Sequence, residues 1–241
     1  EPLDHITDLI RRLVDRGTEQ QYYLFFLKYH EADIAEALAD VTPDERARFF
    51  SKVKLESGAD VFEEMEPSFQ LQLVESLKTE LVAKYVGEMD PDDAADLMED
   101  LREEDEELAD EILEALPESE AADIQELLSY NEDSAGALMT SEYLWIPEDL
   151  TVSGAIDSYR SQAPPDSELS FYVYIVDGNG TLVGVTSIRN LLLAEPDEPI
   201  KDVRNDSPIK VHQDVDQEKV AKMFRKYDLV VLPVVDDWDQ L

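Results

Sequence analysis

The sequence has no cysteine and is poor in basic residues, with 20 lysine and arginine residues against 58 acidic ones. Without cysteine, disulfide bonds, thiolate metal sites and cysteine nucleophiles are all excluded. The formal net charge of −38 leaves no basic footprint for phosphate groups, so nucleic acid and anionic membrane surfaces are not expected partners. Cations are the natural counterparts of such a chain. A solvated acidic surface suited to a salt-rich cytoplasm is the alternative explanation of the charge.

Long apolar runs and catalytic motifs are missing as well. No stretch approaches the roughly 20 apolar residues that span a bilayer, and no signal peptide follows Glu1. The three histidines, His5, His30 and His212, are isolated, and no GxSxG, GxGxxG or phosphate-loop motif is present. We therefore predict that the chain is not an enzyme. The absence of an initiator methionine suggests a fragment of a longer protein.

Hydrophobic residues make up 43% of the 241 positions, enough for two modest domains that each bury a core. Between residues 3 and 129 the apolar residues recur at spacings of three and four. Leu71, Val74 and Leu77 are one example. Because this is the period of an amphipathic helix, the region is predicted to be helical throughout.

Within the helical region a degenerate sequence motif recurs every 24 to 27 residues. Its copies are ADIAEAL (32–38), ADVFEEM (59–65), AKYVGEM (83–89) and ADEILEAL (109–116). Each copy is followed by a proline: Pro43, Pro67, Pro91 and Pro117. Proline in the first turn of a helix loses no hydrogen bond, and acidic residues just behind it complement the helix dipole. The repeat therefore predicts short helices stacked as a solenoid.

The linker YNEDSAGALMT (130–140) ends the helical region, and Gly136 marks the boundary. Beyond it, FYVYIVDGNGTLVGVTSIRNLLL (171–193) predicts a strand, a turn, a strand and a helix, and LVVLPVVDDWDQL (229–241) begins the same unit again. The prolines of SQAPPDSE (161–168) predict a surface loop. Such a tandem repeat has a cleft between its halves, which suits ligand sensing better than catalysis. We expect domains at 1–131, 132–200 and 201–241, the last of them truncated.

Three phrases carry a family resemblance: MDPDDAADLM (89–98), AGALMT (135–140) and DQEKVAKMFRKYDLVVLPVVD (216–236). The part after the linker resembles a pair of cystathionine-β-synthase (CBS) domains. Together with the helical repeat, it resembles the cytosolic part of MgtE-type magnesium transporters and channels. The resemblance implies an α plus α/β fold, in which an N-terminal superhelical repeat domain precedes a tandem CBS pair with an incomplete second member. It also implies a Mg²⁺ sensor at the cytoplasmic face of the cell membrane, below a pore that these residues do not contain, and homodimers formed through the CBS domains.

By position, the resemblance assigns six Mg²⁺ ligands: Asp60, Asp92, Asp96, Ala137, Glu218 and Asp228. Asp92 and Asp96 are four residues apart, on one face at a predicted helix start. Asp60 stands where the family more often has glutamate, and Ala137, which would offer a backbone oxygen, where glycine is common. Mg²⁺ prefers oxygen ligands and keeps several waters, so carboxylates from two bodies can hold it in hydrated form. The alternative is that each acid is only solvated surface.

The resemblance also implies an adenine-nucleotide site, with ATP as the possible ligand. GVTSIRN (184–190) matches a pattern whose last residue is an acid that holds ribose hydroxyls; here Asn190 takes that place without a charge. Tyr172 or Tyr174 would lie against the base and Arg189 near the phosphates. The alternative is that the tyrosines belong to ordinary strand packing and that the nucleotide site is vestigial.

Our leading interpretation is therefore a cytosolic Mg²⁺-sensing region in which the cation bridges acidic faces of the helical and CBS domains. The first alternative is a nucleotide-binding CBS regulator whose acidic helices dock a partner. A second alternative is a halophilic scaffold without a ligand. The Mg²⁺ sensor predicts a response to MgCl₂ that NaCl at equal ionic strength does not reproduce.

Overall fold

The computed structural model describes residues 3–141, 143–162 and 171–241. The chain divides into two compact units, Glu1–Glu126 and Leu127–Leu241, which we call the helical unit and the mixed unit. The division lies a few residues before the predicted boundary at 131. Most of the loop predicted at 161–168 falls outside the described residues.

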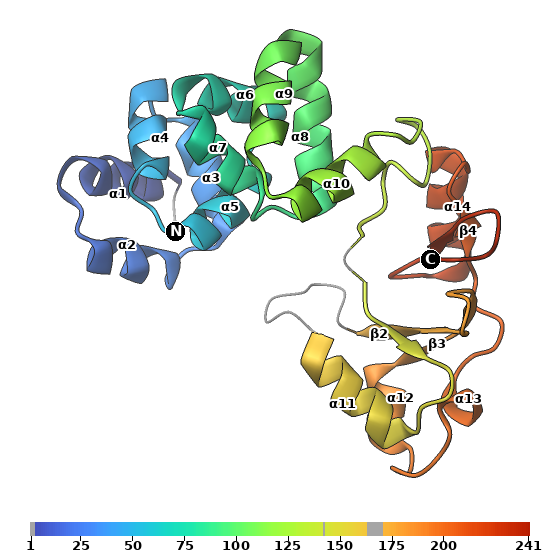
Figure 1. The fold of residues 1–241 in the computed structure, drawn as a ribbon. Coiled ribbons are helices and arrows are strands. Elements are labelled where there is room, and N and C mark those ends of the chain that lie inside the picture. The colour runs from blue at the N-terminus through green and yellow to red at the C-terminus, as the bar shows by residue number, and fades with distance from the viewer. Residues whose placement is uncertain (1–2, 142, 163–170) are drawn as a thin grey trace. The chain divides into compact units, whose positions relative to one another are not determined.

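The helical unit is built from short helices that pack in two rows (Figure 1). They are α1 (Leu3–Arg16), α2 (Glu19–Phe26), α3 (Glu31–Ala39), α4 (Pro43–Phe50), α5 (Leu55–Glu63), α6 (Pro67–Ser76), α7 (Thr79–Val86), α8 (Pro91–Glu104), α9 (Glu106–Ala115) and α10 (Glu118–Leu127). In one row α1, α3, α5, α7 and α9 pack successively on one another, and in the other α4, α6 and α8 do the same. The predicted solenoid of helices is confirmed.

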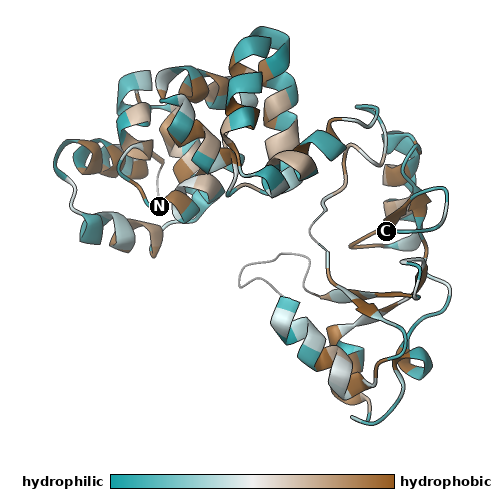
Figure 2. Ribbon diagram, viewed as in Figure 1, coloured by the Kyte–Doolittle hydropathy of each residue, from teal (hydrophilic) through white to brown (hydrophobic). Residues whose placement is uncertain are grey.

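Prolines and capping residues fix where these helices begin. Pro43, Pro67 and Pro91 are the first residues of α4, α6 and α8. Before α4, Thr42 closes a capping box, in which its hydroxyl accepts from the backbone of Glu45 and the Glu45 carboxylate accepts from the backbone of Thr42. The predicted helix starts at these prolines are therefore correct. Hydrophobic and hydrophilic residues are interspersed along these helices (Figure 2), and in α1 the buried residues Ile6, Ile10 and Leu13 recur at helical spacing.

Aromatic side chains connect successive repeats in the core of the helical unit. The Phe50 ring lies 5.6 Å from Phe49, 5.7 Å from Phe62 and 5.5 Å from Tyr85, measured between centroids. The Tyr85 hydroxyl donates a hydrogen bond of 2.6 Å to the Phe50 carbonyl oxygen. A Cβ on Gly58 would lie 2.6 Å from the Tyr85 ring, so the close packing of α5 on α7 requires glycine there.

We expect Tyr85→Phe to lower the free energy of unfolding of the helical unit by about 1–2 kcal/mol. The ring packing is preserved, but the carbonyl oxygen of Phe50, a residue only 1% exposed, loses its donor. Chemical denaturation followed by far-UV circular dichroism measures the change. Tyr23→Phe is the control, because Tyr23 is 55% exposed on α2 and its loss should have little effect. Equal stability of Tyr85→Phe and the parent would contradict a structural role for this hydrogen bond.

The mixed unit alternates strands and helices. Its elements are β1 (Trp145–Pro147), α11 (Val152–Gln162), β2 (Tyr172–Val176), β3 (Leu182–Ser187), α12 (Ile188–Leu193), α13 (Ile200–Val203), β4 (Val211–His212), α14 (Gln217–Tyr227) and β5 (Val234–Val235). β1 pairs with β2 in parallel, and β2 pairs with β3 in antiparallel register. Ile146, Val173 and Ile175 from this sheet pack against Ala155 of α11 and Leu191 of α12. The predicted strand, turn, strand and helix at 171–193 is confirmed.

The second copy of this unit is shorter than the first. β4 and β5 pair in parallel over two residues each, Val211 with Val234 and His212 with Val235. Because Pro233 has no N–H to donate to a strand ladder, β5 begins only after it, at Val234. The ends of the two copies meet, since the Leu182 backbone donates to the carbonyl of Asp239 at 2.9 Å. In the described part of the chain, no helix is long and apolar enough to cross a bilayer.

Candidate metal centre

Three carboxylates gather at the start of α8. Oxygens of Asp90, Asp92 and Asp93 all lie within 4.8 Å of one another. Asp90 is the N-cap residue of α8 but makes no side-chain capping bond, and Pro91 follows as the first helical residue. Acidic side chains are stabilised here because the helix dipole places partial positive charge at this end.

A half-buried glutamate from the preceding repeat completes this acidic cluster. Glu63, at the end of α5, accepts a hydrogen bond of 2.8 Å from the backbone N–H of Asp90. Burial raises the pKa of Glu63 to about 8, and the charges of Asp90, Asp93 and Asp60 add to the increase. Ionisation of Glu63 would place another negative charge beside these acids, so Glu63 stays protonated to a higher pH than a free glutamate.

The acidic residues along α8 also repel one another, and this repulsion contributes to raised pKa values of two of them. Asp93 is exposed as a residue, but partial burial of its carboxyl group, together with the charges of Asp92 and Asp90, raises its pKa to about 6. Burial also raises the pKa of Asp96, and Asp92 and Asp100 reinforce the effect. A proton or a cation relieves this repulsion, so Glu63 keeps its proton near neutral pH unless a cation compensates the negative charges around it.

The predicted ligands of the helical unit fall within or beside this cluster. Asp92 belongs to the group of three, Asp96 lies one turn further along α8, and Asp60 lies on α5 close enough to raise the pKa of Glu63. The sequence argument missed Asp90, Asp93 and Glu63. Two of these could have been found from the run Asp90-Pro91-Asp92-Asp93, and the third from its position three residues after Asp60 on the same helix.

The donor set fits a hard divalent cation. Each available ligand atom in the group is a carboxylate oxygen, the ligand type that Mg²⁺ and Ca²⁺ prefer. Oxygens in an octahedron around Mg²⁺ lie about 3–4 Å apart. Small side-chain rotations would bring oxygens that lie within 4.8 Å of one another to that spacing, and water would supply the remaining ligands.

The predicted ligands of the mixed unit are spread along α14 and the linker. The linker of Ala137 runs beside the start of α14, where the Ala135 and Gly136 backbones donate to the carbonyls of Val215 and Gln213 at 2.8 Å. Glu218 is 80% exposed in the first turn and pairs with Lys222 at 3.3 Å. Asp228 is the left-handed C-cap residue. Since α14 rises about 15 Å between Glu218 and Asp228, these two carboxylates cannot hold one ion.

The predicted nucleotide residues lie on β2 and α12. Tyr172 is half-buried at the start of β2, opposite Ser187 in the register. Tyr174 is buried with Leu182 and Val235, and burial raises the pKa of its phenol to about 12, with Tyr172 adding to the rise. Arg189 and Asn190 are exposed in the first turn of α12. Tyr174 thus has a packing role in this fold, while the other three present polar groups near one end of the sheet.

Comparisons with known proteins agree with this arrangement. A family model for the MgtE intracellular N domain matches residues 29–133, and a CBS domain model matches residues 135–197. The solved structure of the soluble part of a magnesium transporter is 30% identical, with a TM-score of 0.91, over 100% of this chain and 93% of that one. The chain belongs to the MgtE family. The resemblance and the fold class predicted from the sequence are thereby confirmed.

Other MgtE proteins extend the comparison. The solved cytosolic domain of the Mg²⁺ channel MgtE in complex with ATP is 29% identical, with a TM-score of 0.89, over 98% of this chain and 94% of that one. The magnesium transporter MgtE of Thermus thermophilus is 38% identical over 141 residues, which are 58% of this chain and 31% of that protein. The matched regions are 31%, 27% and 28% of the length of three curated MgtE relatives.

Proposed function

We propose that this chain is the Mg²⁺-sensing regulatory region of an MgtE transporter or channel and has no catalytic role. The observation that carries the proposal is the acidic cluster of Asp90, Asp92 and Asp93 with Glu63, an all-oxygen donor set in which burial and repulsion raise the pKa of Glu63 and Asp93. Its support is the match of the surrounding helices to the MgtE intracellular N domain. The isolated histidines and the absence of a nucleophile motif agree with a sensor.

The proposed mechanism is electrostatic. Two carboxylates about 5 Å apart repel by roughly 3 kcal/mol at an effective dielectric constant near 20. When Mg²⁺ is scarce, opposed acidic faces therefore favour separation. Bound Mg²⁺ reverses the sign of the interaction and selects the associated state by its higher affinity for it. The proposed ligands are Asp60, Asp92 and Asp96 of the helical unit together with the Ala137 carbonyl, Glu218 and Asp228 of the mixed unit, and they would hold more than one ion because Glu218 and Asp228 are too far apart to share one.

We place this sensor at the cytoplasmic face of a membrane, next to a transmembrane domain outside these residues. Support comes from the names of the MgtE relatives, which are magnesium transporters, and from the small part of their length that the chain spans. We further propose that the chain dimerises through its CBS region. In that setting Mg²⁺ acts as a regulatory ligand, and association of the sensor gates the pore.

Small-angle scattering tests the proposal. Millimolar Mg²⁺ is expected to decrease the radius of gyration, whereas NaCl at matched ionic strength leaves it nearly unchanged, because screening alone does not create a bridge. An unchanged radius of gyration in Mg²⁺ would contradict the sensor function.

A pair of variants localises the effect. Asp92→Asn/Asp96→Asn should abolish most of the Mg²⁺ response, because it removes two ligands while preserving shape. Glu103→Gln/Glu107→Gln removes the same charge from exposed positions of α8 and α9 and should respond like the parent. Equal responses of the two double variants would mean that total charge, and not this site, governs the effect. Stabilisation by KCl equal to that by MgCl₂ would favour the halophilic scaffold.

ATP is a second candidate ligand, favoured by the similar cytosolic domain solved in complex with ATP. Tyr172, Arg189 and Asn190 would contact it in this chain. Calorimetric titration with ATP tests this, and Arg189→Gln should weaken any binding. Heat with ATP together with indifference to Mg²⁺ alone would favour a nucleotide-binding regulator over the Mg²⁺ sensor.

A further inference from the structure

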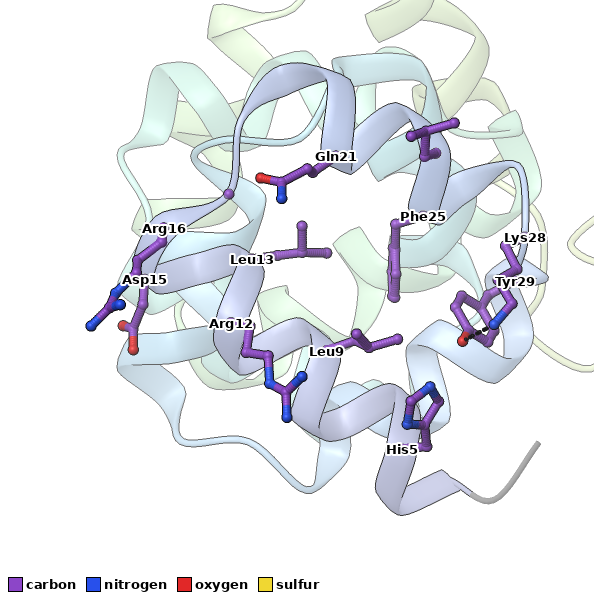
Figure 3. A pocket seen from close by; sticks show the side chains of 12 residues that line it. His5, Leu9, Arg12, Leu13, Asp15, Arg16, Gln21, Phe25, Lys28 and Tyr29 are labelled. Carbon is purple, nitrogen blue, oxygen red and sulfur yellow. Dashed lines mark hydrogen bonds between the residues drawn. The ribbon is translucent and has the colours of Figure 1, made fainter.

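A cavity of about 870 Å³ lies between α1 and α2 of the helical unit (Figure 3), and none of the acidic cluster residues is among those that line it. Its lining residues are His5, Leu9, Arg12, Leu13, Asp15, Arg16, Gly17, Gln21, Leu24, Phe25, Lys28 and Tyr29. The two helices meet at a tight turn, since a Cβ on Gly17 would lie 2.5 Å from the Leu13 carbonyl oxygen. This volume lies within the range of sites that hold small organic molecules.

The walls of the cavity are apolar. Figure 3 shows the side chains of Leu9, Leu13 and Phe25 converging on the space between the helices. Leu13 and Phe25 are 8% and 5% exposed and form the floor of the cavity, whereas Leu24, which also lines it, is 54% exposed. An exposed large apolar side chain at the edge of an apolar floor favours binding of an apolar body.

The polar rim of the cavity is basic, against the charge of the chain as a whole. Arg12, Arg16 and Lys28 contribute to the lining, in a sequence with 20 lysine and arginine residues against 58 acidic ones. The acidic residue among the lining positions, Asp15, lies 3.3 Å from the guanidinium of Arg48, which offsets its charge. Within the described part of the chain, no carboxylate lies at ion-pair distance from Arg12 or Arg16. The rim therefore attracts anions.

We propose that this cavity binds an amphipathic organic anion, with its apolar body against Leu9, Leu13 and Phe25 and its anionic head against Arg12, while Arg16 adds positive charge at the edge of the rim. The chemistry is opposite to that of the acidic cluster on α8, so the site is a second and separate ligand site of the helical unit. A divalent cation is repelled by the rim, and a fully hydrated anion gains nothing from the apolar walls. A ligand that carries both an apolar body and an anionic head can contact the apolar walls and the basic rim at the same time.

Anilinonaphthalene sulfonate, a fluorescent amphipathic anion, is a direct probe. We expect saturable binding of the probe to the full chain. Decanoate, below its micelle concentration, should displace it, whereas decanol and acetate, which have only the apolar body or only the charge, should do so poorly. Displacement by decanol as effective as by decanoate, or fluorescence that does not saturate, would overturn the proposal.

Variants place the probe in the cavity. Arg12→Gln/Arg16→Gln should weaken probe binding by at least about tenfold, because charge-assisted contacts to the head are lost. Arg102→Gln/Arg160→Gln removes the same charge from exposed positions on α8 and α11 and should bind like the parent. Equal affinity of the two double variants would overturn the assignment. The decanoate and decanol comparison on the parent chain needs no variant, so it decides the question even if a double variant fails to fold.

The same assay distinguishes a lipid from a dissolved organic acid as the source of the ligand. Displacement of the probe by phosphatidylglycerol vesicles as well as by free decanoate would identify a lipid headgroup and chain. Displacement by free decanoate alone would identify a dissolved organic acid. Both results support the site, whereas displacement by vesicles without displacement by decanoate would overturn it, because the cavity holds single molecules.

Discussion

Arg46→Ala is expected to lower the free energy of unfolding of the helical unit by about 3–5 kcal/mol. Arg46 is only 2% exposed, and its Nε and Nη2 atoms donate to the carbonyl oxygen of Leu38 at 3.1 and 3.0 Å. The guanidinium also lies 4.4 Å from the ring centroid of Phe69. Truncation therefore leaves a cavity and removes two donors from the last turn of α3 at once.

Burial of a cation without a carboxylate partner is costly, and burial lowers the pKa of Arg46 accordingly. Two features offset the cost. The Leu38 carbonyl lies near the C-terminus of α3, where the helix dipole is negative, and the aromatic face of Phe69 adds a cation–π contact. Because both depend on the planar fork of the guanidinium, Arg46→Lys should recover less than half of the lost stability.

Arg48→Ala is the matched control on the same helix. Arg48 forms ion pairs with Asp44 at 2.9 Å and Asp15 at 3.3 Å, but its side chain is 43% exposed. Exposed ion pairs contribute less than about 1 kcal/mol. Denaturation with urea, followed by far-UV circular dichroism, compares the variants. A loss from Arg48→Ala as large as that from Arg46→Ala would show that surface charge, and not buried hydrogen bonding, stabilises α4.

The role of Arg46 recurs in the next repeat. Gln70, 24 residues later, is also buried and donates to the carbonyl oxygen of Phe62 at 2.8 Å, again eight residues upstream. In the third repeat the corresponding residue is Ala94, which has no donor. The sequence pattern did not predict this, because arginine and glutamine at a core position resemble exposed polar residues until the tertiary contact is known.

What the sequence could predict follows from local chemistry. Prolines such as Pro43 and Pro67 set helix starts through backbone geometry alone, and the structure confirms them. Asp92 and Asp96 could be placed on one face because helical spacing is fixed. Glu63 could not be assigned to the acidic cluster, since its contact with the Asp90 backbone depends on how the fold brings the end of α5 to the start of α8. Local patterns thus located part of the candidate site, and packing between repeats supplied the rest.

Removing the charge of Glu63 is expected to stabilise the helical unit at alkaline pH in the absence of Mg²⁺. The pKa of Glu63 rises from 4.5 in the unfolded chain to about 8 in the folded one, chiefly because of burial. Its contribution to stability is therefore fully present below about pH 4.5 and is lost as the pH rises through about 8. The pKa of Asp93 is raised to about 6 by burial of its carboxyl group and by Asp92, so the folded state loses further stability as the pH rises from about 4 to about 6.

Glu63→Gln keeps an acceptor for the Asp90 N–H and removes the titration. Because Glu63 is partly exposed to solvent screening, we expect a gain of about 1–2 kcal/mol near pH 8 and little change near pH 4. Denaturation midpoints across this range, with a chelator present, measure it. Glu45→Gln is the control, and it should lower the stability near pH 8 instead of raising it. The Thr42 backbone lowers the pKa of Glu45, so its contribution is present above about pH 4.5 and lost as the pH falls.

The same variant connects stability to the proposed ligand. If Mg²⁺ binds beside Glu63, the cation compensates the charges of Asp90 and Asp93 and lowers the cost of ionising Glu63 in the parent chain. Saturating Mg²⁺ should therefore reduce the advantage of Glu63→Gln near pH 8 by more than half, while NaCl at equal ionic strength reduces it only slightly. An advantage that Mg²⁺ leaves unchanged would mean that the ion does not bind at this cluster, even if it binds elsewhere on the chain.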